Sequence, residues 1–116
     1  FGLAETGYTP ARAILAAGGA LAIATDCNPG TSWCESMQMM LALATRYLRL
    51  TPGQALAAAT LNSAFALGIG DRVGSLEPGK QADLLVLGEP DVRHLGYRYG
   101  GNLVQAVIKA GEVWSF

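Results

Sequence analysis

The chain has 116 residues, of which 51% are hydrophobic and 15% are charged, with a formal net charge of −1 at pH 7. So apolar a composition argues against disorder and indicates one globular domain's worth of chain. The eight basic and nine acidic residues are scattered, so no basic stripe can follow a phosphate backbone, and we expect no nucleic-acid partner.

Two further features bear on location. The longest apolar stretch, residues 13–25, contains two glycines and is shorter than the about 20 residues that a bilayer span needs, so we expect no membrane segment. Cys27 and Cys34 form no Cys-x-x-Cys pair and have no nearby histidine, which argues against a zinc knuckle or a disulfide framework. Reduced thiols of this kind predict a cytoplasmic protein.

The first predicted elements are a helix and a strand. Thr9 can cap a helix over residues 10–17, which begins with a proline and ends at two glycines. Residues 20–25 are a continuous run of small apolar side chains, which is typical of a parallel strand buried on both faces. That run ends in Asp26 and an Asn-Pro-Gly turn, as a strand does where its carboxyl end opens onto a functional loop.

Two more helices follow this loop. Ser32 and Glu35 have the spacing of a capping box, and the apolar residues after them recur at helical intervals up to Leu50. Thr51 and Gln54 repeat the start signal around a proline and open an alanine-rich helix over residues 55–67, which Gly68 ends. A break of that helix near Asn62-Ser63 is compatible with the sequence.

The last part of the chain has β character. After a turn at Pro78-Gly79, residues 83–87 and 103–109 read as strands, and the segment between them, 89–102, is predicted to be a loop. Ala110-Gly111 then turns the chain into residues 112–116, which predicts a hairpin with the strand before it.

Individual polar residues have ordinary interpretations when taken alone. An aspartate after a strand is usually a turn former or a cap, and only the whole string A-T-D-x-N-P-G-T outweighs that interpretation for Asp26. Ser32 is assigned to the helix cap. Cys27 has no nearby histidine base, so we expect it to pack, and His94 is interpreted as a solvated or locally bonded surface residue.

Four segments together resemble the C-terminal part of the imidazolonepropionase family, which belongs to the metal-dependent amidohydrolases. They are ATDCNPGTSWCESM, LTPGQALAAATLNSAFALG, RVGSLEPGKQADLLVL and NLVQAVIKAGEV, and they cover nearly the whole chain. The third is shared across much of the superfamily, whereas the Asn-Pro-Gly after the aspartate of the first is the more specific feature.

The resemblance implies an α/β fold. Residues 1–68 would be the end of a (β/α)₈ barrel, its last strand and helices, and residues 69–116 the C-terminal part of a small composite β-sandwich. A complete barrel needs roughly 250 residues. We therefore expect a C-terminal fragment of an enzyme of roughly four hundred residues, by analogy with barrel-plus-sandwich proteins. The His-x-His motif of the family is missing from this sequence, so the chain alone is expected to be inactive.

The resemblance also implies the site residues. Asp26 matches the family's aspartate at the end of the eighth barrel strand, which ligates or approaches a catalytic Zn²⁺ or Fe ion and exchanges protons with the attacking water. Asn28, Gly30 and Thr31 match positions that contact substrate. Their side-chain amide, backbone amide and hydroxyl suit a small molecule with a polar ring and a carboxylate tail.

The implied reaction is hydrolysis of the ring amide of 4-imidazolone-5-propanoate to N-formimino-L-glutamate, a step of histidine degradation, in a homodimeric enzyme. An amidohydrolase acting on another cyclic amide or amidine, of the hydantoinase or cytosine-deaminase type, remains an alternative. A non-catalytic stand-alone domain is a second one. Ligands of this kind accept either zinc or iron, so the choice of metal stays open.

Overall fold

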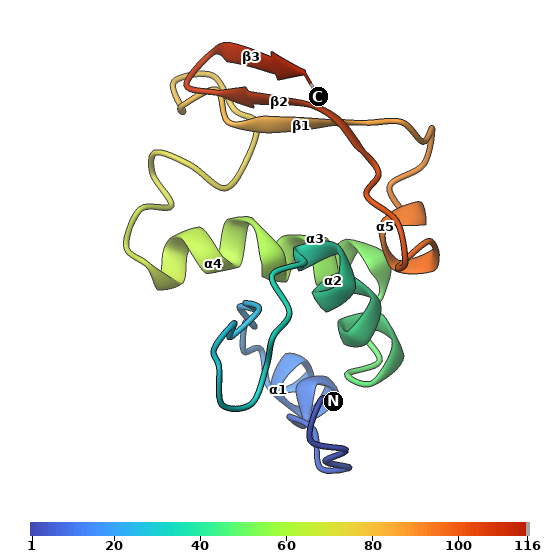
Figure 1. Cartoon of the computed structure of the whole chain (residues 1–116). Helices are drawn as coiled ribbons and strands as arrows, with labels where there is room; N and C mark the ends of the chain where they lie inside the picture. Colours follow the sequence, from blue (N-terminus) through green and yellow to red (C-terminus); the bar gives the residue numbers. More distant parts are fainter. Residues whose placement is uncertain (116) are drawn as a thin grey trace.

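The computed structural model describes residues 1–115, and its elements form a helical part and a small sheet (Figure 1). The α2, α3 and α4 helices lie between the sheet on one side and the N-terminal segment with α1 on the other. This mixture agrees with the predicted α/β class. The elements in chain order are α1 (Ala11–Ala16), α2 (Met37–Arg46), α3 (Pro52–Ala59), α4 (Leu61–Ala66), β1 (Leu84–Leu87), α5 (His94–Tyr97), β2 (Val104–Lys109) and β3 (Glu112–Ser115).

The core is built from alanine and leucine side chains where α2, α3 and α5 meet. Ala55 and Ala58 on α3 are each only 1% exposed, so the helix backbones can approach one another closely. Partly buried leucines and Ile23 pack around this core. Its buried members are Ala11, Leu41, Ala44, Leu50, Ala55, Leu95 and Leu103.

The capping box predicted for the third helix is confirmed. The Thr51 hydroxyl accepts a hydrogen bond from the Gln54 amide at 3.2 Å, and the Gln54 side chain accepts one from the Thr51 amide at 3.0 Å. The break in this helical region lies at Thr60, two residues before the predicted pair. Gly68 ends the region as predicted, with a left-handed φ of +71°.

Two predicted helix caps are wrong. The α1 helix begins after Pro10 with no side-chain cap, so Thr9 does not serve as one. The α2 helix begins at Met37, where the Ser36 hydroxyl accepts a hydrogen bond from the Met39 amide at 3.2 Å. Ser32 cannot begin a helix because its backbone is engaged in a β-bridge with Asn28.

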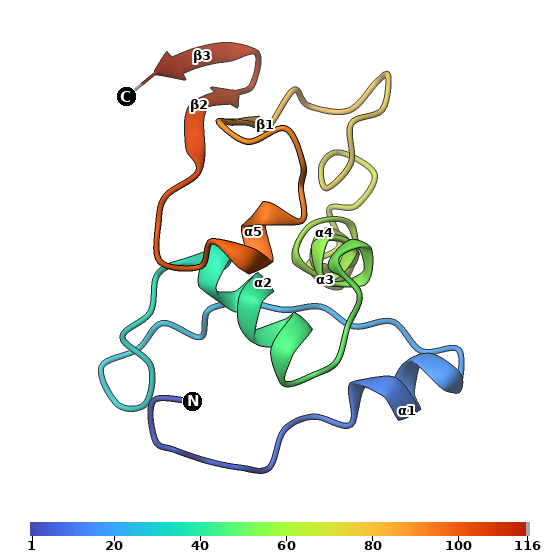
Figure 2. The same ribbon diagram turned by 90° about the vertical axis from the view of Figure 1, so that its right-hand side faces the viewer.

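Residues 20–25 are not a strand, although their composition predicts one. A strand needs a neighbouring strand to complete its hydrogen bonds, and none lies beside this segment within residues 1–115. The helices supply the partners instead. The side-chain amide of Asn62 donates to the Leu21 carbonyl at 2.8 Å, and the Ser63 hydroxyl donates to the Ile23 carbonyl at 3.2 Å. The Ile23 amide donates to the Ala58 carbonyl at 3.1 Å, so the segment crosses the two helices where α3 and α4 join; Figure 2 views these helices end-on, with the segment passing below them.

The three predicted strands are confirmed within the described residues, and only Phe116 lies outside them. They form an antiparallel sheet of order β1-β2-β3. Leu85, Val107 and Trp114 share one row across the sheet. Ala110 and Gly111 turn β2 into β3 with φ angles of +52° and +87°, as a two-residue hairpin turn with right-handed strand twist requires.

The predicted loop over residues 89–102 contains the one-turn helix α5, which the sequence analysis missed. Glu89 holds it by pairing with Arg98, while His94 Nδ1 lies 3.3 Å from Glu89 Oε2. The His94 side chain is partly exposed, as expected, but its Nδ1 atom is buried and makes no hydrogen bond within residues 1–115, so the prediction of a solvated or locally bonded residue is confirmed only in part. At the start of the segment the Arg93 side chain, followed by its backbone amide, lowers the pKa of Asp91 to about 2.

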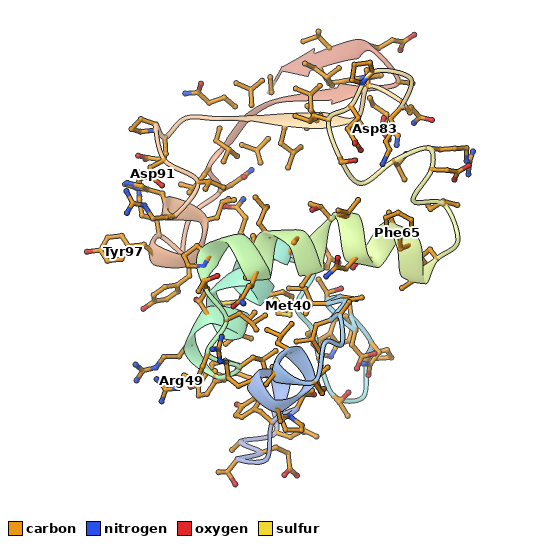
Figure 3. All side chains as sticks on the ribbon, turned by 180° about the vertical axis from the view of Figure 1, so that it is seen from behind. Met40, Arg49, Phe65, Asp83, Asp91 and Tyr97 are labelled. Carbon is orange, nitrogen blue, oxygen red and sulfur yellow. The ribbon has the colours of Figure 1, made fainter. Side chains whose placement is uncertain are left out.

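Asp83 joins the start of β1 to the hairpin turn; Figure 3 labels it near the end of the sheet. Its carboxylate accepts hydrogen bonds from Lys109 Nζ at 2.5 Å and from the Ala110 amide at 2.9 Å. Lys109, then Gln81 and the Ala110 amide, lower the pKa of Asp83 to about 2 from its ordinary value of 3.8. The ionised carboxylate thus ties the start of β1 to the end of β2 and to the hairpin turn.

We predict that replacing Asn62 with alanine lowers the free energy of unfolding by about 1 kcal/mol, because the Leu21 carbonyl loses its donor and only helix propensity is gained. Denaturant titration followed by circular dichroism measures the change. Glu35→Ala, at an exposed position, is the control and should leave the midpoint unmoved. Equal midpoints for Asn62→Ala and the parent protein would contradict the assignment.

A second prediction concerns acid stability. Because the pKa of Asp83 is lower in the folded chain, its contribution is present above pH 3.8 and is lost as pH falls through about 2. Asp83→Asn should therefore be less stable than the parent at pH 5, and the two should converge near pH 2. Denaturant midpoints at both pH values test this, with Asp71→Asn as an exposed-carboxylate control. A difference that persists at pH 2 would rule out this linkage.

Candidate functional site

A groove of about 610 Å³ lies beside the loop that follows residues 20–25. Three of the four predicted site residues, Asp26, Gly30 and Thr31, line it, and Asn28 does not. Apolar side chains line it as well, among them Met39 and Met40 from α2; Figure 3 labels Met40 where this helix lies next to the loop. The lining of the groove therefore combines polar and apolar groups.

Asp26 stands at the point where the apolar segment turns into the loop. It is exposed, and its φ of +49° lies in the left-handed region, which aspartate enters more readily than most residues but at a cost. Its backbone carbonyl accepts a hydrogen bond from the Asn28 amide group at 2.6 Å. Within residues 1–115 its carboxylate makes no hydrogen bond, so both oxygens can meet a ligand.

The Asn28 side chain holds the loop together. Its Oδ1 atom accepts hydrogen bonds from the backbone amides of Gly30 at 2.9 Å and Thr31 at 2.8 Å, while Nδ2 donates to Asp26. This is the Asx-turn arrangement that asparagine favours. The geometry gives Asn28 a positioning role, and its predicted contact with substrate stays a prediction.

Asn28 approaches Gly30 closely. A Cβ atom built at Gly30 would lie 3.2 Å from Asn28 Oδ1, closer than ordinary van der Waals contact. The resemblance implies that the backbone amide of Gly30 contacts substrate, but here this amide donates a hydrogen bond to Asn28 Oδ1. Gly30 can contact a ligand through its Cα and carbonyl groups while its amide holds the turn.

Thr31 and Ser32 close the loop. The Thr31 hydroxyl lies 3.1 Å from Asn28 Nδ2 and 3.2 Å from Asn28 Oδ1, and it also borders the groove. The backbone amide of Asn28 donates to the Ser32 carbonyl at 2.7 Å, and the Ser32 hydroxyl donates to the Thr25 carbonyl at 3.2 Å. The loop therefore returns to the segment from which it left, which keeps Asp26 and Thr31 on one side of the groove.

The chain does not complete a metal site by itself. Among residues 1–115 no group of three or more histidine, cysteine, aspartate or glutamate side chains is placed to hold an ion. A catalytic zinc site takes three protein ligands, and Asp26 is one carboxylate. Cys27 is exposed, contrary to the packing role expected for it, and Cys34 is partly buried; both are free thiols.

The structure adds groove residues that the sequence analysis did not single out. Glu5 and Leu3 approach from the N-terminal segment, and Trp33 follows the loop. Nothing in the local pattern marks Glu5 because its place in the groove depends on a non-local approach. The position of Trp33, two residues after Thr31, is a signal that could have been used.

Comparison with known proteins places the chain in a class. Residues 2–113 match the model of the amidohydrolase family, so the chain belongs to this family.

No helix within residues 1–115 has the length and apolarity needed to cross a bilayer.

The curated proteins similar to this chain include imidazolonepropionases. The one from Herpetosiphon aurantiacus is 60% identical over 113 residues, and the one from Rubrobacter xylanophilus is 49% identical over 102 residues. These matches cover 97% and 88% of this chain, but only 26% and 25% of the two relatives. The chain thus spans about a quarter of the length of the curated relatives it matches.

Solved structures support the same class. A zinc-bound adenosine deaminase from Xanthomonas campestris matches with a TM-score of 0.76 and 33% identity, over 92% of this chain and 28% of its own. An amidohydrolase from Thermotoga maritima matches with a TM-score of 0.70 and 30% identity, over 91% of this chain and 26% of its own. The fold of this chain therefore recurs in larger amidohydrolases.

The loop predicts a measurable difference between two Asn28 variants. Asn28→Ala removes the acceptor of the Gly30 and Thr31 backbone amides. Each lost hydrogen bond contributes about 1 kcal/mol, so the two amides should exchange with deuterium at least about fivefold faster than in the parent protein. Asn28→Asp keeps an acceptor oxygen and should retain most of the protection. Residue-resolved hydrogen exchange measures both. Equal exchange in the two variants would show that Oδ1 does not hold the loop.

Proposed function

We propose that the protein carrying this chain hydrolyses the ring amide of 4-imidazolone-5-propanoate to N-formimino-L-glutamate. The observation that carries the proposal is the 60% identity with an imidazolonepropionase across 97% of the chain. The exposed Asp26 carboxylate at the edge of a groove of about 610 Å³ is what the reaction needs from this part of the molecule. Residues that hold the loop, Asn28 above all, would keep this carboxylate in place.

The proposal includes an assignment of the two parts of the chain. Residues 1–68 would be the end of a (β/α)₈ barrel and residues 69–116 the C-terminal part of a composite β-sandwich. The apolar segment 20–25, which helices rather than strands satisfy here, has the composition of a strand buried on both faces. With neighbouring strands beside it, Asp26 would stand at the carboxyl end of a barrel strand, where such barrels keep their active sites.

The proposed chemistry at Asp26 is proton transfer. Water adds to the ring carbonyl carbon, and one carboxylate oxygen of Asp26 accepts the proton that the water gives up. The ring carbon–nitrogen bond then breaks, and the protonated Asp26 returns its proton to the leaving nitrogen. One residue can serve both steps because Asp26 accepts one proton in the first step and donates one proton in the second, which returns it to its starting state. Thr31, on the same side of the groove, would hydrogen-bond the substrate.

Asp26 is also proposed as one ligand of a Zn²⁺ or Fe ion whose other ligands lie outside these 116 residues. Support comes from the zinc-bound adenosine deaminase of similar fold. The single carboxylate at the groove is compatible with this role but does not select between the two metals. A homodimeric state and a cytoplasmic location stay predictions.

A second candidate function is hydrolysis of another small heterocycle. The observation that favours it is the 33% identity with an adenosine deaminase, whose name implies a cyclic amidine substrate. A similar groove could accept such a ring. The two candidates share the proposed role of Asp26 but differ in substrate and, for a deaminase, in the bond that breaks, which is the exocyclic carbon–nitrogen bond.

The test uses the protein as its gene encodes it, with the metal supplied, assayed for consumption of imidazolonepropionate, hydantoin, cytosine and adenosine. Imidazolonepropionate should be the preferred substrate, and Asp26→Asn should lower kcat by about 100-fold or more because general acid–base transfer is lost. Asp71→Asn, an exposed carboxylate outside the groove, is the matched control and should retain the parent rate.

Preferential turnover of another ring would replace the proposed substrate with the second candidate. A folded protein that turns over none of the four would support the non-catalytic alternative. Activity that survives in Asp26→Asn would remove Asp26 from the chemistry whatever the substrate.

A further inference from the structure

Trp33 is the most exposed large side chain that borders the groove. It is 80% exposed, and it lines the same space as Asp26 and Thr31. An indole ring in water leaves a large apolar surface uncovered, and covering it with another flat apolar surface is favourable. Trp33 is therefore positioned to receive a planar group that enters the groove.

The loop determines where Trp33 stands relative to the reacting carboxylate. Trp33 directly follows Ser32, whose carbonyl accepts from the Asn28 amide at 2.7 Å and whose hydroxyl donates to the Thr25 carbonyl at 3.2 Å. The first bond joins Ser32 to Asn28, two residues after Asp26, and the second joins the Ser32 side chain to Thr25, the residue before Asp26. The residue before Trp33 is thus held next to the backbone on both sides of Asp26, and the side chains of Trp33 and Asp26 line the same groove.

The charged residues of the groove indicate which part of a ligand this part of the chain binds. The described lining of the groove contains two carboxylates, Asp26 and Glu5, and no lysine or arginine side chain. No cationic side chain of this described lining can pair with an anionic tail, so this part of the chain offers its contacts to the ring of a ligand, and any carboxylate of the ligand would be bound by other residues. Met39 and Met40 offer polarisable sulfur and methyl groups that favour the faces and edges of such rings.

We propose that Trp33 is a specificity-determining residue that stacks on the ring of a planar five-membered heterocycle and so places its carbonyl carbon beside Asp26. This inference rests on the proposed function of the groove, and it adds that the ring, not the carboxylate tail, is what this part of the chain selects. Trp33 binds substrate in this assignment and transfers no proton.

The test compares Trp33→Leu and Trp33→Phe in the protein as its gene encodes it, with Trp114→Leu as a control for loss of an exposed tryptophan outside the groove. Trp33→Leu should raise KM for imidazolonepropionate about tenfold, as the loss of an aromatic pair predicts, and leave kcat nearly unchanged. Trp33→Phe keeps an aromatic face and should recover most of the affinity. Trp114→Leu should match the parent protein in both constants.

A non-reacting probe separates this inference from the proposed function. Imidazole-4-propanoate has the planar ring and the tail but no ring carbonyl to hydrolyse, and glutarate has carboxylates without a ring. Calorimetry should show weaker binding of the imidazole compound to Trp33→Leu by about tenfold and no change for glutarate. Saturable fluorescence quenching by the imidazole compound should disappear in Trp33→Leu and persist in Trp114→Leu.

The outcomes are distinct. Absence of turnover by the parent protein would refute the proposed substrate alone, and ring-dependent binding lost in Trp33→Leu would still support stacking. Unchanged KM and unchanged probe binding in Trp33→Leu would overturn the role of Trp33. A lowered melting temperature with unchanged KM would overturn it too, because Trp33 would then pack against protein instead of ligand.

Discussion

The structure of the N-terminal half depends on how the backbone of residues 20–25 finds its hydrogen-bond partners. Partly buried amide and carbonyl groups must be paired, and this segment has no strand beside it among the described residues. Asn62 and Ser63 reach it from α4, and Ala58 accepts from it on α3. These contacts hold the segment against the helices, and therefore place Asp26 at its end over the groove.

The loop after Asp26 separates positioning from chemistry. Asn28 uses its amide oxygen on Gly30 and Thr31 and its amide nitrogen on the Asp26 carbonyl, which leaves the Asp26 carboxylate uncommitted. The left-handed backbone of Asp26 is strained, and the surrounding hydrogen bonds sustain it. The hydrogen bonds therefore hold the backbone around Asp26, while its exposed carboxylate, to which we assign the proposed proton transfer, stays unbonded within residues 1–115.

The segment shared across the superfamily, G-S-L-E-P-G-K-Q-A-D, has a structural role in this chain. Lys80 donates to the Gly70 carbonyl and to the Ser75 hydroxyl, each at 2.7 Å, and pairs with Glu77. Asp83 joins β1 to the hairpin turn through Ala110. These contacts hold the loop before β1 and its junction with the hairpin, and none of their residues lines the groove.

Features governed by neighbouring residues could be predicted from the sequence: the Thr51 capping box, the Ala110-Gly111 hairpin and the end of α4 at Gly68. Each depends on contacts within a few positions. Residues 20–25 and Ser32 were predicted wrongly because a strand and a cap also depend on partners distant in the chain, and the tertiary structure supplied helix groups and a β-bridge instead. The sequence by itself determined the Thr51 cap, the hairpin turn and the three C-terminal strands, and through resemblance it proposed Asp26, Asn28, Gly30 and Thr31 as site residues. Only the tertiary structure decided that Trp33 and Glu5 border the same groove as Asp26, because it alone brings the N-terminal segment, the loop and α2 together.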